Sequence, residues 1–145
     1  MNRLFGVISL ILFAIVLALG AFAIAQSSPA TAMVYILIIL FFTLLIIYSF
    51  CTKCQCRHHS CGHVLPGKLA GMLPEREQTN YSFMDIFITF FSLIIILAFP
   101  QPWLYGNKYL FFCFWIIMAI GGALVTFFVC SKCENKKCPV CRKKT

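Results

Sequence analysis

The chain has 145 residues, of which 61% are hydrophobic and only 11% are charged. Soluble domains are about half apolar and about one-quarter charged, so this composition excludes an ordinary soluble globular protein. A helix that crosses a bilayer needs roughly 20 apolar residues, which leaves room for about four crossings and no separate soluble domain. The sequence therefore predicts an all-α integral membrane protein, with a single membrane domain over residues 1–145.

A formal net charge of +8 also suits a nucleic-acid-binding protein. The basic residues of this chain, however, flank the apolar spans and form no stripe interleaved with exposed aromatic residues. We therefore expect the charge to set the membrane topology, and we expect no nucleic-acid partner.

Residues 4–25 and 32–50 are uncharged, and each run is long enough to cross a bilayer. The polar break Gln26-Ser27-Ser28-Pro29 between them predicts a turn. The first run also resembles a signal peptide that ends in small residues, but it exceeds the usual length of one and favours an uncleaved helix. The second run is too long for a buried strand, so the two runs predict a helical hairpin.

The third span covers residues 83–99 and the fourth covers residues 109–129, and these predict a second hairpin. Ser82 followed by Asp85 fits a capping box, which places the carboxylate in the positive first turn of the third helix. We expect Pro100-Gln101-Pro102 to end this short helix. Aromatic residues near the connection have the position of an interfacial belt: Trp103, Tyr105 and Tyr109.

Orientation follows from the lysines and arginines beside the spans. The connection over residues 51–82 holds four of them and the tail over residues 130–145 holds six, whereas the first connection has none and the third has Lys108. Because basic residues concentrate on the cytoplasmic side, we expect both termini, the Cys/His-rich connection 51–82 and the basic tail 130–145 to be cytoplasmic.

The two halves of the chain repeat coarsely. Each half reads as helix, short turn, helix and a basic Cys-rich segment, and Cys51-Thr52-Lys53-Cys54 matches Cys130-Ser131-Lys132-Cys133 in spacing. We treat duplication of a hairpin unit as a hypothesis, with chance similarity of basic helix ends as its alternative.

Eight of the nine cysteines lie in the two cytoplasmic segments. The tail has two CxxC pairs separated by a short loop, an arrangement that commonly builds a tetrahedral four-thiolate metal site. Its candidate ligands are Cys130, Cys133, Cys138 and Cys141. The turn formed by residues 138–141 resembles a zinc knuckle over those four residues.

The middle segment offers more ligands than one tetrahedral ion uses. One set joins three thiolates to one imidazole, with Cys56 able to replace any member: Cys51, Cys54, Cys61 and His63. His58 and His59 are interpreted as interfacial polar residues. A second partition has one ion bridge the Cys51/Cys54 and Cys130/Cys133 pairs and so tie the second helix to the fourth.

Thiolates with imidazole suit zinc or an iron-sulfur cluster and fit magnesium or calcium poorly. Zinc is the preferred cofactor, because neither segment has the spacing of a common cluster motif. An iron-sulfur cluster and metal-free thiols are the alternatives, and a reducing cytoplasm disfavours disulfides. Cys113 is interpreted as a small residue packed inside the fourth span, and alanines four apart are expected at helix contacts: Ala14 and Ala18, Ala21 and Ala25, Ala119 and Ala123.

These features favour a small accessory or structural membrane subunit over an enzyme, since no run of residues forms a catalytic signature. Its metal site would present a platform on which a protein partner or a larger membrane complex docks. The alternative is an iron-sulfur or dithiol redox protein that passes electrons to or from a membrane partner. An apolar stretch over residues 64–74 is too short to span and is expected to lie on the membrane surface.

Overall fold

The structure, a computed structural model, describes residues 2–54, 64–74, 76 and 81–130. Its elements in chain order are α1 (Asn2–Ala25), α2 (Pro29–Ile46), the π-helical turn η1 (Ile47–Cys51), α3 (Val64–Met72), α4 (Phe83–Ala98), α5 (Gln101–Leu104), α6 (Lys108–Leu124) and the π-helical turn η2 (Val125–Val129). The described residues form an all-α protein with four helices long and apolar enough to span a membrane. The predicted fold class is therefore confirmed.

The four spans are Leu4–Ala25, Pro29–Cys51, Phe83–Leu104 and Lys108–Val129. The second span begins earlier than predicted because the Ser28 side chain accepts a backbone N–H bond as N-cap and proline follows at the first helical position, where its missing N–H does no harm. The way in which two of the spans end was not predicted. Both the second and the fourth span end in a π-helical turn.

The expectation that Pro100-Gln101-Pro102 ends the third helix is confirmed for α4, which ends at Ala98 with Phe99 as its C-cap. Pro100 is buried and serves as the N-cap of the short separate helix α5, which carries the apolar span beyond α4. A proline is well tolerated in the first turn of a helix, so Pro102 does not stop α5. The third span therefore reaches Leu104 and equals the first in length, 22 residues.

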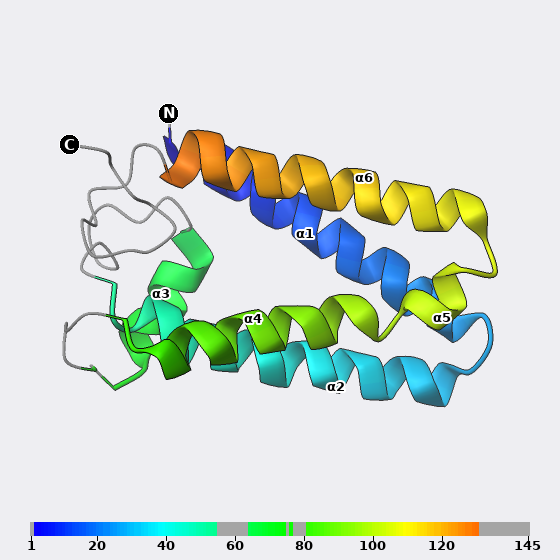
Figure 1. Cartoon of the computed structure of the whole chain (residues 1–145), viewed down its shortest axis with the longest axis horizontal. Helices are drawn as coiled ribbons and strands as arrows, with labels where there is room; N and C mark the ends of the chain where they lie inside the picture. Colours follow the sequence, from blue (N-terminus) through cyan, green and yellow to red (C-terminus); the bar gives the residue numbers. More distant parts are fainter. Residues whose placement is uncertain (1, 55–63, 75, 77–80, 131–145) are drawn as a thin grey trace.

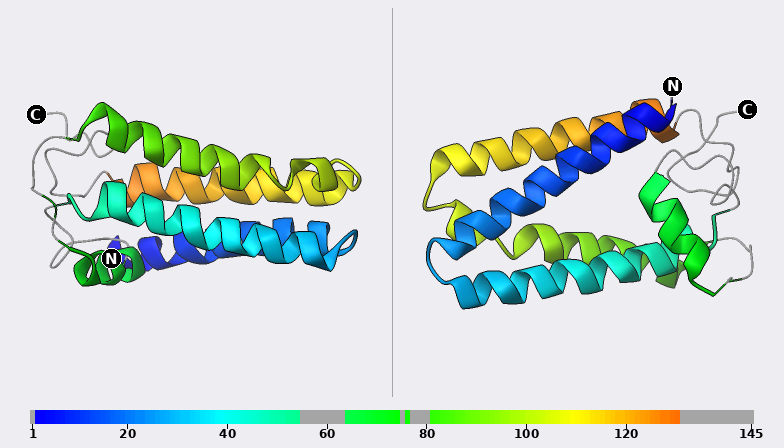
Figure 2. Two further views of the ribbon diagram at one scale, coloured as in Figure 1. Left: turned by 90° about the horizontal axis from the view of Figure 1, so that it is seen from below. Right: turned by 180° about the vertical axis from the view of Figure 1, so that it is seen from behind.

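The helices form a bundle with two different ends (Figure 1). We call the end formed by η1, α3, η2 and the start of α1 the cysteine end, and the opposite end, with the two connections and α5, the turn end. Helix α1 makes its most extensive contact with α6, and α2 packs equally on α1 and α4, so each hairpin packs on the other. Figure 2 shows α1 running obliquely, from α6 at the cysteine end to α2 at the turn end. Helix α5 contacts both α1 and α6.

The two hairpins are built in the same register. Leu4–Ala25 and Phe83–Leu104 have equal lengths, and Ser28 and Asn107 follow them at equal distances. Both of these N-cap side chains accept hydrogen bonds from backbone N–H groups of the next turn. Equal spans, equal connections and equivalent caps support the hypothesis that a hairpin unit was duplicated.

Residues further along the second helix of each unit also correspond. Tyr35 and Phe114 stand the same number of positions after their N-caps, and both side chains are fully buried. Cys51 and Cys130 correspond in the same way. The pairing of α1 with α6 is then the counterpart of the pairing of α4 with α2, which is the relation expected of parallel repeats about an axis along the bundle.

The buried core lies toward the turn end. One cluster contains Val16, Ala23, Leu104 and Phe114, and a second contains Ile24, Ala32 and Tyr35. Trp103, which lies beside the last residue of the third span, is half-buried and packs against both clusters, so this member of the expected belt is directed partly inward. Tyr105 and Tyr109 are exposed at the turn end, as a belt requires.

Close helix contacts are made at Gly20 and Gly121, and of the expected alanines only Ala21 packs against a core cluster. Gly20 is buried, and a Cβ there would stand 3.1 Å from the Tyr35 hydroxyl and 3.2 Å from Pro100 Cβ. Gly121 is buried against Phe13. Of the six alanines named above, Ala21 is half-buried and the other five are exposed, because the oblique path of α1 brings other faces together.

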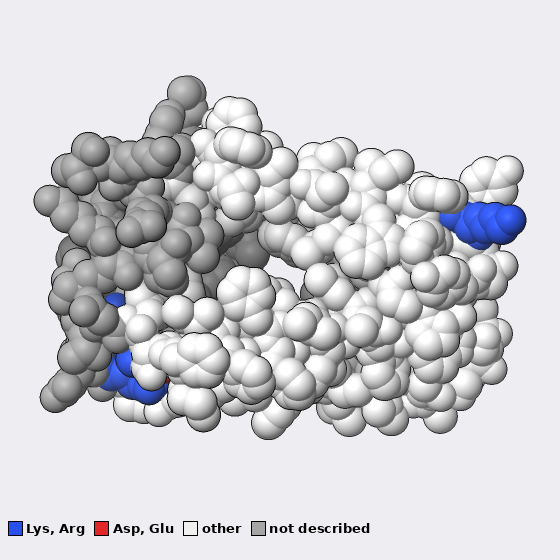
Figure 3. Space-filling model, viewed as in Figure 1, with Lys and Arg blue, Asp and Glu red and all other residues white. Residues whose placement is uncertain are grey.

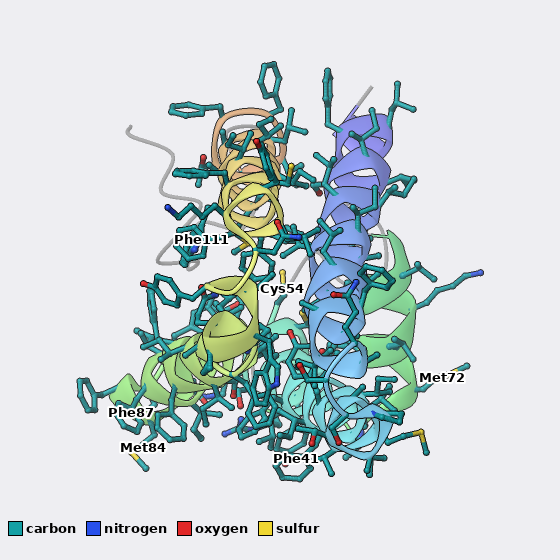
Figure 4. All side chains as sticks on the ribbon, turned by 90° about the vertical axis from the view of Figure 1, so that its right-hand side faces the viewer. Phe41, Cys54, Met72, Met84, Phe87 and Phe111 are labelled. Carbon is teal, nitrogen blue, oxygen red and sulfur yellow. The ribbon has the colours of Figure 1, made fainter. Side chains whose placement is uncertain are left out.

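The outer surface of the spans is strongly apolar. Only 17% to 28% of each span's most hydrophobic window is buried inside the bundle, so most of these side chains face outward, where a bilayer solvates them. Figure 4 shows Phe41, Met84 and Phe87 directed away from the helices. On the face seen in Figure 3, the described lysines and arginines lie at the two ends with an uncharged band between them. The predicted contact with lipid is confirmed in this sense.

Candidate functional site

The Cys51–Cys54 motif begins in the last residue of η1. The Thr52 N–H donates to the Ile47 carbonyl oxygen at 3.1 Å, which closes the π turn, and the Cys54 N–H donates to the Cys51 carbonyl oxygen at 3.1 Å. The Thr52 hydroxyl also donates to the Tyr48 carbonyl oxygen. These bonds make the motif a compact turn that continues the helix, with a fixed backbone at both cysteines.

The two residues between the cysteines are directed into the protein. Thr52 is 1% exposed and Lys53 is 8% exposed, whereas Cys51 and Cys54 are half-buried. Viewed along the bundle, the Cys54 side chain lies inside the outline of the helices, unlike the outward Met72 (Figure 4). Thr52 and Lys53 therefore hold the Cys51–Cys54 turn against the rest of the protein.

Lys53 is held by Asp85 in the first turn of α4. The Lys53 Nζ atom donates to Asp85 Oδ2 at 2.5 Å, and the carboxylate is only 3% exposed. The Ser82 N–H donates to the same oxygen at 3.0 Å, which confirms this arm of the predicted capping box. Asp85 thus caps its own helix and neutralises a buried lysine from another, since a buried charge without a partner is strongly unfavourable.

Arg76 completes this group, which we call the Asp85 cluster: Lys53, Arg76 and Asp85. Arg76 Nη1 donates to Asp85 Oδ1 at 3.0 Å, and its guanidinium lies over the Tyr48 ring at 5.2 Å. Arg76 is about one-third exposed, so its contact with the carboxylate is partly screened by solvent. Two cations, Lys53 and Arg76, therefore share the Asp85 carboxylate.

Aromatic contacts bind the chain before α4 to the end of the second span. The Phe50 and Tyr81 rings stack with centroids 4.6 Å apart, and the Tyr81 hydroxyl donates to the Phe50 carbonyl oxygen at 3.3 Å. Helix α3 packs against η1 as well. Its exposed Leu65, Leu69 and Met72 follow the spacing of one helix face, which suits the predicted position at a membrane surface.

The second motif begins at Cys130, which follows η2 as its C-cap and is buried. Near it, Phe128 stacks on Phe5 of α1 with centroids 4.8 Å apart. Cys113 is exposed on α6, so the expectation that it packs inside the fourth span is wrong.

The other predicted ligands lie outside the described residues: Cys56, Cys61, His63, Cys133, Cys138 and Cys141, together with His58 and His59. Within the described part of the chain, no three His, Cys, Asp or Glu side chains gather closely enough to hold an ion. Cys51 and Cys54 thus form no such group with Cys130 alone, and a ligand set completed from residues 55–63 or 131–145 stays a prediction.

Sequence reasoning missed the Asp85 cluster. Asp85 is the only aspartate in the chain, and Lys53 is the basic residue inside the first CxxC motif. A lone carboxylate in an otherwise uncharged span is a signal that a cation lies near it. The pairing itself joins residues 32 positions apart and depends on the contact between α2 and α4. Comparisons with protein-family models, curated proteins and solved structures give no match to this chain.

Proposed function

We propose that this protein is a small accessory subunit of a membrane assembly, whose four-helix bundle presents a cytoplasmic Cys/His metal site to a protein partner. The observation that carries the proposal is the common location of the two cysteine motifs. Cys51 ends the second span and Cys130 follows the fourth, both at the cysteine end of the bundle. Two ligand-bearing segments that leave one end of the bundle would present their ligands to a partner there.

The distribution of basic residues supports a cytoplasmic cysteine end. Among the described residues, Lys53, Lys68 and Arg76 belong to the connection at that end, while Lys108 begins α6 at the turn end. Six further lysines and arginines follow Cys130 in sequence. This asymmetry fits the positive-inside rule with both termini in the cytoplasm.

Zinc is the metal that the donor set fits best. Its thiolates and imidazole would come from Cys51, Cys54, Cys56, Cys61 and His63 in the connection and from Cys130, Cys133, Cys138 and Cys141 in the tail. Segments this short bury too little apolar surface to fold alone, and a bound ion supplies that folding free energy. The ion would act structurally, by giving the platform one conformation.

The geometry favours this structural role over the redox alternative. Reactive thiolates are usually found at helix N-termini, where the dipole favours negative charge. Both motifs here begin at the C-terminal ends of spans, where the dipole disfavours it. Dithiol chemistry is therefore the less favoured use of these cysteines, and an iron-sulfur cluster is the form that a redox function would take.

Metal analysis of the protein purified in detergent without oxygen tests the proposal. We expect one or two zinc ions per chain, a colourless protein, and partial loss of zinc in both Cys51→Ser/Cys54→Ser and Cys138→Ser/Cys141→Ser. Cys113→Ser is the matched control, because Cys113 is exposed on a lipid-facing side of α6. Iron with sulfide and visible absorbance would replace the proposal by an electron carrier, and the absence of any metal would end it.

The docking part of the proposal needs a separate measurement. Purification from native membranes in mild detergent, followed by sizing, compares the wild-type chain with Cys138→Ser/Cys141→Ser. We expect a discrete complex for wild type and a smaller species for the variant. A wild-type chain that migrates alone under these conditions would contradict the accessory role.

A further inference from the structure

The Cys51–Cys54 turn is joined to α4 by a polar contact that a structural metal site alone does not require. Lys53, within the motif, is buried and directed at Asp85, while Cys51 and Cys54 keep part of their surface exposed. A lysine on a solvated loop normally keeps its charged end in water. Here the Lys53 ammonium group is buried against Asp85, and this contact fixes the backbone of the Cys51–Cys54 turn.

The Asp85 carboxylate, which accepts the hydrogen bond from Lys53, also accepts hydrogen bonds from other groups. Oδ2 accepts from the Ser82 N–H as well as from Lys53, and Oδ1 accepts from Arg76. Both oxygens are therefore committed, and the carboxylate sits at the positive end of the α4 dipole. Because the Asp85 carboxylate accepts these hydrogen bonds, its orientation is fixed. It therefore also fixes the position of the Lys53 ammonium group.

Asp85 also brings together the two flanks of the Cys/His-rich residues 55–63. Cys54 precedes that segment and α3 follows it, and α3 packs on η1. Arg76, beyond α3, binds the same carboxylate as Lys53. Holding the two flanks of a segment together removes loop-closure entropy that ligand binding would otherwise have to overcome.

We propose that Asp85 is the positioning residue of the first metal site: through Lys53 it holds the Cys51–Cys54 turn ready for zinc before the ion binds. This inference rests on the proposed metal-binding function. It distinguishes the two motifs, because the residue of α1 that corresponds to Asp85 in the repeat is Gly6, which has no carboxylate. Partners behind the ligands commonly change metal affinity by 10- to 100-fold when they are removed.

The test uses the full chain with Cys138→Ser and Cys141→Ser, so that any remaining site uses the ligands of the connection, alone or with Cys130 and Cys133. Zinc affinity is measured by competition with a chromophoric chelator, and alkylation rates of Cys51 and Cys54 are measured in metal-free protein by mass spectrometry. We expect Asp85→Asn and Lys53→Met to weaken zinc binding about 10- to 100-fold and to speed alkylation several-fold. Lys53→Arg keeps the cation and should restore both values.

Lys68→Met is the control, since Lys68 is an exposed lysine of the neighbouring α3. Lys53→Met keeps the Arg76–Asp85 contact and so decides the question if Asp85→Asn fails to fold. Wild-type affinity and alkylation rates in Lys53→Met would overturn the inference while leaving zinc binding intact. Absence of zinc from the wild-type chain would reject the proposed function, whereas unchanged alkylation in Lys53→Met would reject positioning whether or not the parent chain binds zinc.

Discussion

The Tyr35 hydroxyl donates a hydrogen bond to the Ile96 carbonyl oxygen at 3.0 Å, across the contact between α2 and α4. In a continuous α-helix that carbonyl would accept from the residue four positions later, which here is Pro100 and has no N–H. The next carbonyl, of Leu97, is served by the Gln101 side chain at 2.6 Å. The Tyr35 hydroxyl therefore replaces the donor that Pro100 lacks, and the Gln101 side chain serves a second carbonyl at the end of α4.

We expect Tyr35→Phe to lower the free energy of unfolding by about 1 kcal/mol, because the Ile96 carbonyl loses its donor. Reversible unfolding in mixed detergent micelles measures this loss. In a Pro100→Ala background the backbone N–H returns, so the same Tyr35→Phe change should cost clearly less. Equal losses in both backgrounds would mean that the hydroxyl does not act on this carbonyl.

The repeat explains why the corresponding position holds phenylalanine. Phe114 stands where Tyr35 stands in the other unit, and Ala21 of the unbroken α1 stands where Pro100 does. No carbonyl of α1 is orphaned there, so a hydroxyl at position 114 has nothing to repair. Phe114→Tyr should therefore destabilise the bundle by about 1 kcal/mol or more, through burial of an unsatisfied hydroxyl, in the same unfolding assay.

Gly20 and Gly122 form a matched pair for testing the helix contacts. A Cβ at Gly20 would press on the Tyr35 hydroxyl and on the rigid Pro100 ring, while a Cβ at Gly122 meets nothing within 4 Å. We expect Gly20→Ala to destabilise the bundle by about 1 kcal/mol, and Gly122→Ala to stabilise α6 by up to about 1 kcal/mol through helix propensity. Thermal unfolding should show a lower melting temperature for Gly20→Ala and a higher one for Gly122→Ala. Shifts in the same direction would contradict the close packing at Gly20.

The Asp85 cluster predicts the order in which three substitutions lower the free energy of unfolding. Asp85→Ala leaves Lys53 and Arg76 facing each other without a carboxylate and should cost about 3 kcal/mol or more. Lys53→Met leaves Asp85 paired with Arg76 and should cost less, and Arg76→Gln, at a partly exposed site, should cost about 1 kcal/mol or less. Urea or SDS titrations rank the three variants, and a mild Asp85→Ala variant would contradict the order.

Topology is testable with amine chemistry on the unmodified chain. Lys108 at the turn end and Lys68 on α3 are both exposed. A membrane-impermeant amine reagent applied to sealed cells should label Lys108, and Lys68 should react only after the membrane is opened. Labelling of Lys68 on intact cells would invert the orientation and place the cysteine motifs outside.

The four spans could be predicted because length and apolarity alone decide whether a segment crosses a bilayer. The Ser82–Asp85 cap was equally readable, since it is local in sequence. What escaped prediction depends on which helices touch. The partly inward Trp103, the outward Cys113 and the Lys53–Asp85 pair each follow from the arrangement of α1, α4, α5 and α6 around one another. Several ligand positions predicted from spacing lie outside the described residues and stay predictions.

The π-helical turn η1 has an evolutionary and engineering consequence for the cysteine end. Each residue of a helix rotates the chain by about 100°, so removing one residue from η1 would restore ordinary helical geometry and turn everything after it by that angle. Lys53 would then leave the side of the helix that faces Asp85. A single-codon deletion within Ile47–Cys51 would preserve the span's ability to cross a bilayer while uncoupling it from the Asp85 cluster at the cysteine end.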